Sequence, residues 1–128
     1  MGKARILIMD DEELVLNVAC RMLEFLGYET ASARNGEQAV EAYRSRMAAG
    51  ERFDAVILDW QVHNGMDGLK AMEQLRLLDP KAKGILSSGY SETDQGASTA
   101  SRGFDGVIAK PYVLKTMQET VEKVLKSG

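Results

Sequence analysis

Short apolar runs alternate with longer amphipathic stretches along the chain. Each run has the length and residue types of a β-strand, and the runs occupy residues 5–9, 28–33, 55–59, 84–88 and 107–109. The stretches between and after them carry apolar residues at helical spacing, which predicts helices over residues 12–26, 37–48, 69–78 and 114–125. Residues 92–102 contain no large apolar side chain, so the further helix expected there is thin and weakly amphipathic.

This strand–helix alternation occurs five times, which predicts one parallel sheet with helices on both faces. We therefore expect a flavodoxin-like doubly wound α/β fold with five helices and five strands in the order 2-1-3-4-5. We also expect an apolar stripe of the first helix to face the sheet. The stripe consists of Leu14, Val18, Met22 and Phe25, widened by Val15, Ala19 and Leu26.

Two of the expected strands end in carboxylates. The run Ala55–Asp59 is apolar until its last residue, and the run Arg5–Met9 is followed by Asp10 and Asp11. In adjacent parallel strands these three acids crowd into one pocket at the carboxyl ends, where open α/β sheets bind ligands. Like charges so close repel one another unless a cation joins them. Because all the ligands are hard oxygens, the expected cation is Mg²⁺ or a similar divalent ion.

The fourth and fifth strands bring further polar groups to the same edge of the sheet. Ser87 lies at the end of the fourth strand, and Lys110 directly follows the fifth. A pocket with three carboxylates, a hydroxyl and an ammonium suits transfer of a phosphoryl group to a carboxylate. Asp59 is the candidate nucleophile, while Ser87 and Lys110 can bind the phosphoryl oxygens.

Composition limits the kind of protein that carries this pocket. The chain has 128 residues, a net charge of −3 and a single cysteine, Cys20. That length predicts one domain spanning residues 1–128. The acidic balance, without a cluster of Lys and Arg, argues against direct binding of nucleic acid. No apolar run approaches the ~20 residues of a membrane helix, and the lone cysteine fits a reducing cytoplasm. We therefore expect a cytoplasmic protein that does not bind a membrane.

The chain resembles a response-regulator receiver domain of two-component signalling. The motifs that carry the resemblance follow the family's order and spacing: Asp10-Asp11-Glu12, the apolar strand into Asp59, Gly65-Met66-Asp67-Gly68, Leu86-Ser87-Ser88-Gly89-Tyr90 and Gly106-Val107-Ile108-Ala109-Lys110-Pro111.

The resemblance implies that Asp59 accepts a phosphoryl group from a histidine of a sensor histidine kinase or phosphotransfer domain. It also implies a Mg²⁺ ion held by Asp11, Asp59 and the backbone carbonyl of Gln61, with Asp10 acting mainly through water. Phosphorylation would then switch the binding of an unknown downstream protein. Such a domain is not an enzyme in the usual sense, because it catalyses only its own phosphorylation and dephosphorylation.

The sequence departs from the family pattern in the loop after Asp59 and in the last strand. His63 stands where proline is usual, and the loop is one residue longer, which resembles receiver domains attached to hybrid histidine kinases. Val107 replaces the aromatic residue that usually couples to the Ser87 hydroxyl. Tyr90 and Tyr112 are the aromatic side chains that can replace it.

Three other classes of protein share parts of this pattern. A haloacid-dehalogenase-type phosphatase requires a second acid two residues after its nucleophile, where this chain has Gln61. A flavodoxin-like flavin binder holds phosphate with Ser, Thr and Gly in its first loop, where the acids of Asp10–Glu13 repel phosphate. A pseudo-receiver, folded alike but not phosphorylated, is the main alternative because of His63 and Val107.

Overall fold

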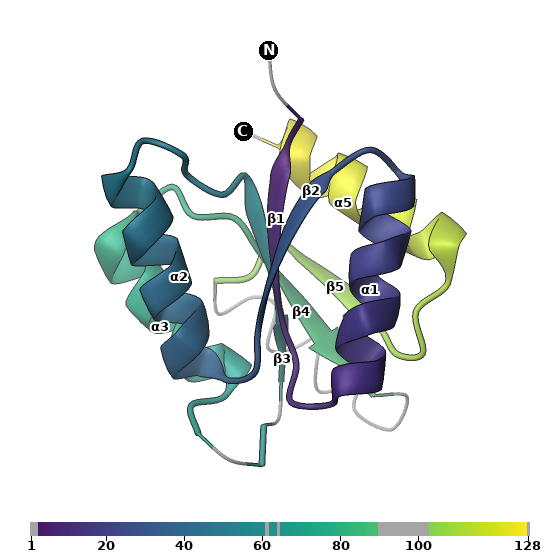
Figure 1. Ribbon diagram of the computed structural model, residues 1–128, viewed down its shortest axis with the longest axis horizontal. Coiled ribbons are helices and arrows are strands. Elements are labelled where there is room, and N and C mark those ends of the chain that lie inside the picture. The colour runs from purple at the N-terminus through teal and green to yellow at the C-terminus, as the bar shows by residue number, and fades with distance from the viewer. Residues whose placement is uncertain (1–2, 61, 64, 90–102, 128) are drawn as a thin grey trace.

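Five parallel strands form the centre of the computed structural model, which describes residues 3–60, 62–63, 65–89 and 103–127 (Figure 1). In spatial order they are β2 (Glu29–Ala33), β1 (Arg5–Met9), β3 (Ala55–Asp59), β4 (Gly84–Ser88) and β5 (Gly106–Ala109). Every neighbouring pair is parallel. The predicted flavodoxin-like sheet and its 2-1-3-4-5 order are confirmed.

The described part of the chain forms four helices, each within one residue of its predicted bounds: α1 (Glu13–Phe25), α2 (Gly36–Ala48), α3 (Gly68–Leu78) and α5 (Leu114–Lys126). Figure 1 shows α2 and α3 on one face of the sheet and α1 and α5 on the other. The helix expected over residues 92–102 lies outside the described residues. None of the described helices has the length and apolar composition needed to cross a membrane.

The predicted inner face of α1 is confirmed only in part. Four of its seven residues lie in or against the core: Val15, Ala19, Met22 and Leu26. The other three are exposed: Leu14, Val18 and Phe25. Leu16, Ala19 and Leu23 are the buried residues of this helix. By contrast, Leu14 and Phe25 are 80% and 78% exposed. Apolar residues occupy most positions of α1 and are spread around more than half of its circumference. Helical spacing therefore fits more than one apolar stripe. Asn17, Arg21 and Glu24 mark the polar side, and the buried stripe lies roughly opposite them.

The three central strands, β1, β3 and β4, are buried on both faces, which is why they are mostly apolar. The edge strand β2 is more polar and only partly buried. Alternate residues of one strand enter different cores, because successive side chains point to opposite faces. Leu58 packs on the side of α2 and α3, whereas Ile57 packs on the side of α1 and α5. This alternation places Asp59 on the same face as Ile57, at the carboxyl end of a fully buried strand.

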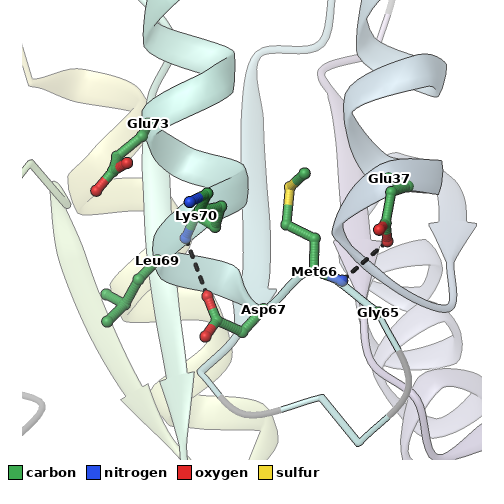
Figure 2. A pocket seen from close by; sticks show the side chains of 7 residues that line it. All are labelled: Glu37, Gly65, Met66, Asp67, Leu69, Lys70 and Glu73. Atoms are coloured by element: carbon green, nitrogen blue, oxygen red, sulfur yellow. Dashed lines mark hydrogen bonds between the residues drawn. The ribbon is translucent and has the colours of Figure 1, made fainter.

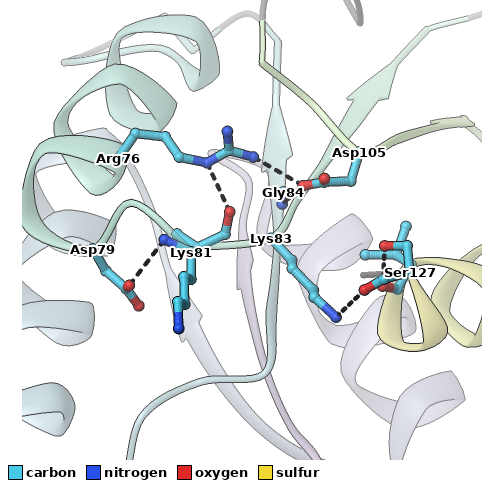
Figure 3. Close-up of polar contacts among 9 residues, drawn as sticks. Arg76, Asp79, Lys81, Lys83, Gly84, Asp105 and Ser127 are labelled. Carbon is cyan, nitrogen blue, oxygen red and sulfur yellow. Dashed lines mark hydrogen bonds and ion pairs between the residues drawn. The ribbon is translucent and has the colours of Figure 1, made fainter.

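At the amino ends of the strands, opposite to Asp59, polar contacts join the ends of several helices and strands (Figure 3). The buried Asp79 carboxylate accepts hydrogen bonds from the Tyr43 hydroxyl at 2.7 Å and the Lys81 backbone N–H at 3.1 Å. Arg52 lies 3.2 Å from the same carboxylate. Burial opposes ionisation, but these three partners hold the pKa of Asp79 below its ordinary value. Asp79 therefore ties α2 and α3 to the segment before β3.

We expect Asp79→Ala to lower the free energy of unfolding by about 3 kcal/mol, because the Tyr43 hydroxyl and Lys81 N–H lose their acceptor. Asp54→Ala is the matched control, since Asp54 is an exposed acid beside β3. We expect Asp54→Ala to lower the free energy of unfolding by only ~1 kcal/mol. Urea denaturation at neutral pH measures both values, and similar values for the two variants would contradict the role given to Asp79.

Candidate acidic pocket at the strand ends

Strand register brings the acidic residues together. Met9 of β1 lies opposite Leu58 of β3, so Asp10 comes next to Asp59 as the two strands end. On the other side of β3, Asp59 lies opposite Ser87 of β4. Asp10 and Ser87 are fully buried, and Asp59 is 4% exposed. The sequence-predicted groups therefore meet at the carboxyl edge of the three central strands.

Lys110 connects two of these acids. Its ammonium nitrogen lies 3.0 Å from an oxygen of Asp59 and 3.2 Å from an oxygen of Asp10. The backbone holds the lysine in place, because the Lys110 N–H donates to the Ser88 carbonyl at 2.8 Å. Lys110 thus neutralises part of the buried negative charge.

The third acid, Asp11, completes a cluster of oxygen ligands. One carboxylate oxygen each from Asp10, Asp11 and Asp59 lies within 4.8 Å of the others. Asp11 accepts a hydrogen bond from the His63 backbone N–H at 2.9 Å, and Asp10 accepts one from the Glu12 N–H at 2.9 Å. Hard, closely spaced carboxylates are the ligands that Mg²⁺ prefers, so the cluster fits a divalent cation.

Burial and charge shift the pKa values in this cluster. Burial, followed by the negative charges of Asp10 and Asp11, raises the pKa of Asp59 to about 6, against the opposing effect of Lys110. Burial alone would lower the pKa of the Lys110 ammonium, but Asp59 and Asp10 raise it above its ordinary value. Lys110 is therefore charged at neutral pH, whereas Asp59 ionises at a cost that a cation can reduce.

The cluster opens to solvent through a surface pocket of about 480 Å³, lined by Asp11, Glu12, Val15, Asp59, His63, Gly89, Lys110 and Pro111. His63 is exposed, as expected of a loop residue. Asp10 and Ser87 are not among the lining residues and are fully buried. A small group that enters the pocket can therefore reach Asp59 and Lys110 from outside.

The last residues of the loop between β3 and α3, residues 65–67, are held by α2. The Met66 backbone N–H donates to the Glu37 carboxylate at 2.8 Å (Figure 2), and the Met66 carbonyl accepts from the Gly36 N–H at 2.7 Å. Asp67 then caps α3 by accepting from the Lys70 N–H at 3.0 Å. Gly68 must lack a side chain, because a Cβ there would collide with the Asp59 carbonyl. The start of α3 therefore packs directly against the end of β3.

The structure brings together five of the six predicted site residues: Asp10, Asp11, Asp59, Ser87 and Lys110. Gln61, the expected source of a carbonyl ligand, lies outside the described residues, as does Tyr90. The contact between Glu37 and Met66 could not be predicted from the sequence, because it joins residues 29 positions apart. Tyr112, one of the two candidate aromatic residues, has its hydroxyl 2.6 Å from the Ser87 hydroxyl.

The fold and this pocket define a doubly wound α/β domain with an acid–lysine site at its topological switch point. A family model described as the response regulator receiver domain matches residues 6–122. The chain therefore belongs to this family and is a receiver domain of two-component signalling.

Relatives and solved structures agree with the family assignment. Sporulation initiation phosphotransferase F of Bacillus subtilis (strain 168) is 29% identical over 125 residues, covering 98% of this chain and 96% of that protein. Sensor kinase CckA of Brucella abortus (strain 2308) is 31% identical over 125 residues, but these cover 98% of this chain and only 13% of the kinase. A CheY-like receiver domain protein from Methanospirillum hungatei JF-1 has a TM-score of 0.82 at 27% identity, covering 97% of this chain and 94% of that one.

Proposed function

We propose that Asp59 is the phosphoacceptor of this receiver domain. The observation that carries the proposal is the short contact of Lys110 with both Asp59 and Asp10 inside a cluster of three carboxylates. In the proposed reaction an Asp59 oxygen attacks phosphorus, the N–P bond of a phosphohistidine breaks, and its electron pair stays on the imidazole. The donor is a histidine of a sensor kinase or phosphotransfer domain in the cytoplasm.

Each neighbouring residue has a role in this proposal. Asp11, Asp59 and the Gln61 carbonyl would hold Mg²⁺, with Asp10 acting through water. When bound, the cation offsets negative charge on the phosphoryl oxygens. Lys110 supplies a second positive charge to those oxygens.

Ser87 donates a hydrogen bond to one phosphoryl oxygen in the proposed reaction. The domain thereby catalyses its own phosphorylation and dephosphorylation and no reaction of a separate substrate. Its output is a changed affinity for a downstream protein, through a shift between two conformations.

The comparisons support the choice of partners. One relative carries the name of a phosphotransferase, and another is a sensor kinase of which this chain matches only a small part. The second match, together with the longer loop after Asp59, supports a relationship to receiver domains attached to hybrid kinases. We propose residues 1–128 as one receiver domain, of which the family model covers 6–122.

Two alternative functions are less well supported. A pseudo-receiver has no need of the lysine and the three acids converging on one open pocket. A haloacid-dehalogenase-type phosphatase lacks its general acid, because position 61 is glutamine.

Incubation with acetyl phosphate and Mg²⁺ tests the proposal. We expect intact-mass spectrometry to show one added phosphoryl group and peptide mapping to assign it to Asp59. Omission of Mg²⁺, or addition of a chelator, should prevent the uptake. No uptake, or uptake at another residue, would rule the proposal out.

The affinity for Mg²⁺ is expected to fall as the pH drops below about 6. The pKa of Asp59 is raised to about 6 in the metal-free protein, and a protonated carboxyl group is a poor ligand. Below that pH the apparent affinity should fall by up to about tenfold for each pH unit. Fluorescence of Trp60, which directly follows Asp59, provides the titration signal. An affinity that stays constant between about pH 7 and about pH 5 would contradict the expected role of Asp59.

A further inference from the structure

A second surface pocket lies at the amino ends of the strands, at the opposite end of the sheet from Asp59. Its volume is about 650 Å³, and four of the residues that line it are cationic: Arg52, Arg76, Lys81 and Lys83. Among the described residues of this lining, Asp105 is the one acid. The chain as a whole carries a net charge of −3, so this cationic pocket has the opposite sign to the rest of the molecule.

The fold explains why these side chains meet. Arg76 lies in the last turn of α3, and Lys81 and Lys83 lie between α3 and β4. Arg52 precedes β3, the strand that pairs with β4. The Val56 N–H donates to the Lys83 carbonyl at 2.9 Å, which joins the two segments where they enter the sheet. Segments distant in the sequence therefore form one cationic cluster.

Two of the four cations are held in position by contacts within the fold (Figure 3). The Lys83 ammonium donates to the carbonyls of Leu125 at 3.1 Å and Ser127 at 2.7 Å. Arg76 donates through Nε to a backbone carbonyl at 2.7 Å and through Nη2 to Asp105 at 2.9 Å. An ammonium has three N–H donors and a guanidinium has five, so both groups keep donors for a ligand.

The other two cations are engaged even less. The Lys81 backbone N–H bonds Asp79, but the Lys81 ammonium has no hydrogen-bond or ion-pair partner among the described residues. Arg52 lies 3.2 Å from Asp79, and its side chain is 53% exposed. Within the described part of the chain, Asp79 and Asp105 are thus the carboxylates that pair with the four cations. Two positive charges remain without a carboxylate partner.

Stabilisation of helix ends explains only part of this charge. Helices α3 and α5 both end at this edge, and a cation near the carboxyl end of a helix is favourable. That effect accounts for Arg76 in α3 and for Lys83, which bonds the last carbonyls of α5. It does not account for Lys81, which lies beyond the end of α3 and directs its ammonium to no carbonyl of the described residues.

We propose that the cationic pocket binds a small polyphosphorylated anion through its phosphate oxygens. Lys and Arg side chains are well suited to phosphate, whose oxygens accept several charge-assisted hydrogen bonds. The two unbalanced positive charges and the concave shape favour an anion with at least two phosphate groups over a single carboxylate. None of the described lining residues is aromatic, so the phosphate groups supply the main contacts. The proposal is independent of the function proposed for Asp59.

Titration with pyrophosphate, followed by backbone amide resonances in NMR spectra, tests the proposal. The titration contains no divalent cation, so that no metal links the anion to the acidic pocket, and about 150 mM NaCl to screen diffuse attraction. We expect saturable shifts at Lys81, Lys83 and Gly84, with a Kd of about 1 mM or lower. The amide resonances of Asp59 and its neighbours in the acidic pocket should not shift.

Lys81→Gln is the test variant, because the Lys81 ammonium has no partner among the described residues. Its urea denaturation should therefore stay close to that of the unsubstituted protein. We expect pyrophosphate to bind Lys81→Gln about tenfold more weakly. Lys81→Arg keeps the charge and should bind within about threefold of the unsubstituted protein.

Lys115→Gln is the matched control. It removes the same charge from an exposed lysine of α5 that does not line the cationic pocket. Binding of pyrophosphate should stay within about twofold of the unsubstituted protein, because the salt screens distant charges.

ADP and citrate distinguish the chemistry of the ligand. ADP carries a diphosphate on a nucleoside. Binding of ADP no tighter than that of pyrophosphate would assign the pocket to inorganic phosphates, and binding about tenfold tighter would assign it to nucleotides. Either result supports the proposal. Citrate has a similar negative charge but carries carboxylates, and we expect it to bind about tenfold more weakly than pyrophosphate.

Three results would overturn the proposal. The first is the absence of saturable shifts at the cationic pocket up to about 10 mM pyrophosphate. The second is an equal loss of binding in Lys81→Gln and Lys115→Gln, and the third is equal binding of citrate and pyrophosphate. The last two would show diffuse attraction in place of a site. None of these results affects the assignment of Asp59, because no step of the experiment uses the acidic pocket.

Discussion

Replacing Asp59 with asparagine is expected to abolish phosphoryl uptake while making the metal-free domain more stable. The carboxamide is not a nucleophile toward phosphorus, so mass spectrometry should find no phosphorylated protein after treatment with acetyl phosphate and Mg²⁺. The gain in stability has an electrostatic cause. Burial and the charges of Asp10 and Asp11 disfavour the ionised Asp59, and asparagine removes that charge.

The sign of the pH dependence follows from the raised pKa of Asp59. Between the ordinary carboxyl pKa and about 6, the folded metal-free protein binds more protons than the unfolded chain does. Its free energy of unfolding therefore falls as the pH rises through that interval. The free energy of unfolding of Asp59→Asn does not fall in this way. The difference in stability between the variant and the unsubstituted protein should therefore grow with pH and level off above about 7. Thermal unfolding in a chelator measures the difference.

Asp54→Asn provides the matched control for Asp59→Asn. Asp54 precedes the same strand at its other end, is exposed and accepts a hydrogen bond from the Arg5 backbone N–H. This variant should take up a phosphoryl group normally and should not gain stability. Phosphoryl uptake by Asp59→Asn, or an equal gain in both variants, would contradict the assignment of Asp59.

Features set by short stretches of sequence could be predicted. A buried parallel strand is apolar on both faces. The apolar runs Arg5–Met9 and Ala55–Asp59 could therefore be predicted as strands, together with the residues at which they end. Because parallel strands end at a common edge, the polar residues that follow them had to meet. Asp10 and Asp59 therefore could be paired from the sequence before any contact was known.

Features set by contacts between distant segments could not be predicted. The inner face of α1 depends on which of several apolar stripes fits the sheet, and spacing alone does not decide among them. The bond between Tyr43 and Asp79 joins residues 36 positions apart, and that between Ser87 and Tyr112 joins residues 25 apart. Tyrosine is common in apolar cores, so the sequence contains no sign that the Tyr43 hydroxyl has a buried partner. For Ser87, the family pattern left both Tyr90 and Tyr112 as candidates, and spacing along the chain did not decide between them.

Replacing Lys110 with methionine is expected to destabilise the metal-free domain, in contrast to Asp59→Asn, which is expected to stabilise it. The substitution leaves the buried Asp10 and Asp59 carboxylates without the ammonium that lies 3.2 and 3.0 Å from them. Removal of one partner from a buried ion pair typically costs about 3 kcal/mol or more, so the metal-free variant should unfold at lower urea concentration. Binding of beryllofluoride, which mimics a phosphoryl group on a carboxylate, should weaken about tenfold to a hundredfold, because a charge-assisted hydrogen bond is lost.

Mg²⁺ should distinguish an electrostatic role of Lys110 from a packing role. If the lysine acts by its charge, a bound cation replaces part of that charge, and Mg²⁺ should stabilise Lys110→Met more than the unsubstituted protein. Lys83→Met is the control, because the Lys83 ammonium bonds the carbonyls of Leu125 and Ser127, away from the pocket. Equal stabilisation of all three proteins by Mg²⁺ would show that Lys110 and the cation do not act on the same carboxylates. Opposite stability changes in Asp59→Asn and Lys110→Met would, in contrast, show that unbalanced negative charge limits the stability of the metal-free domain.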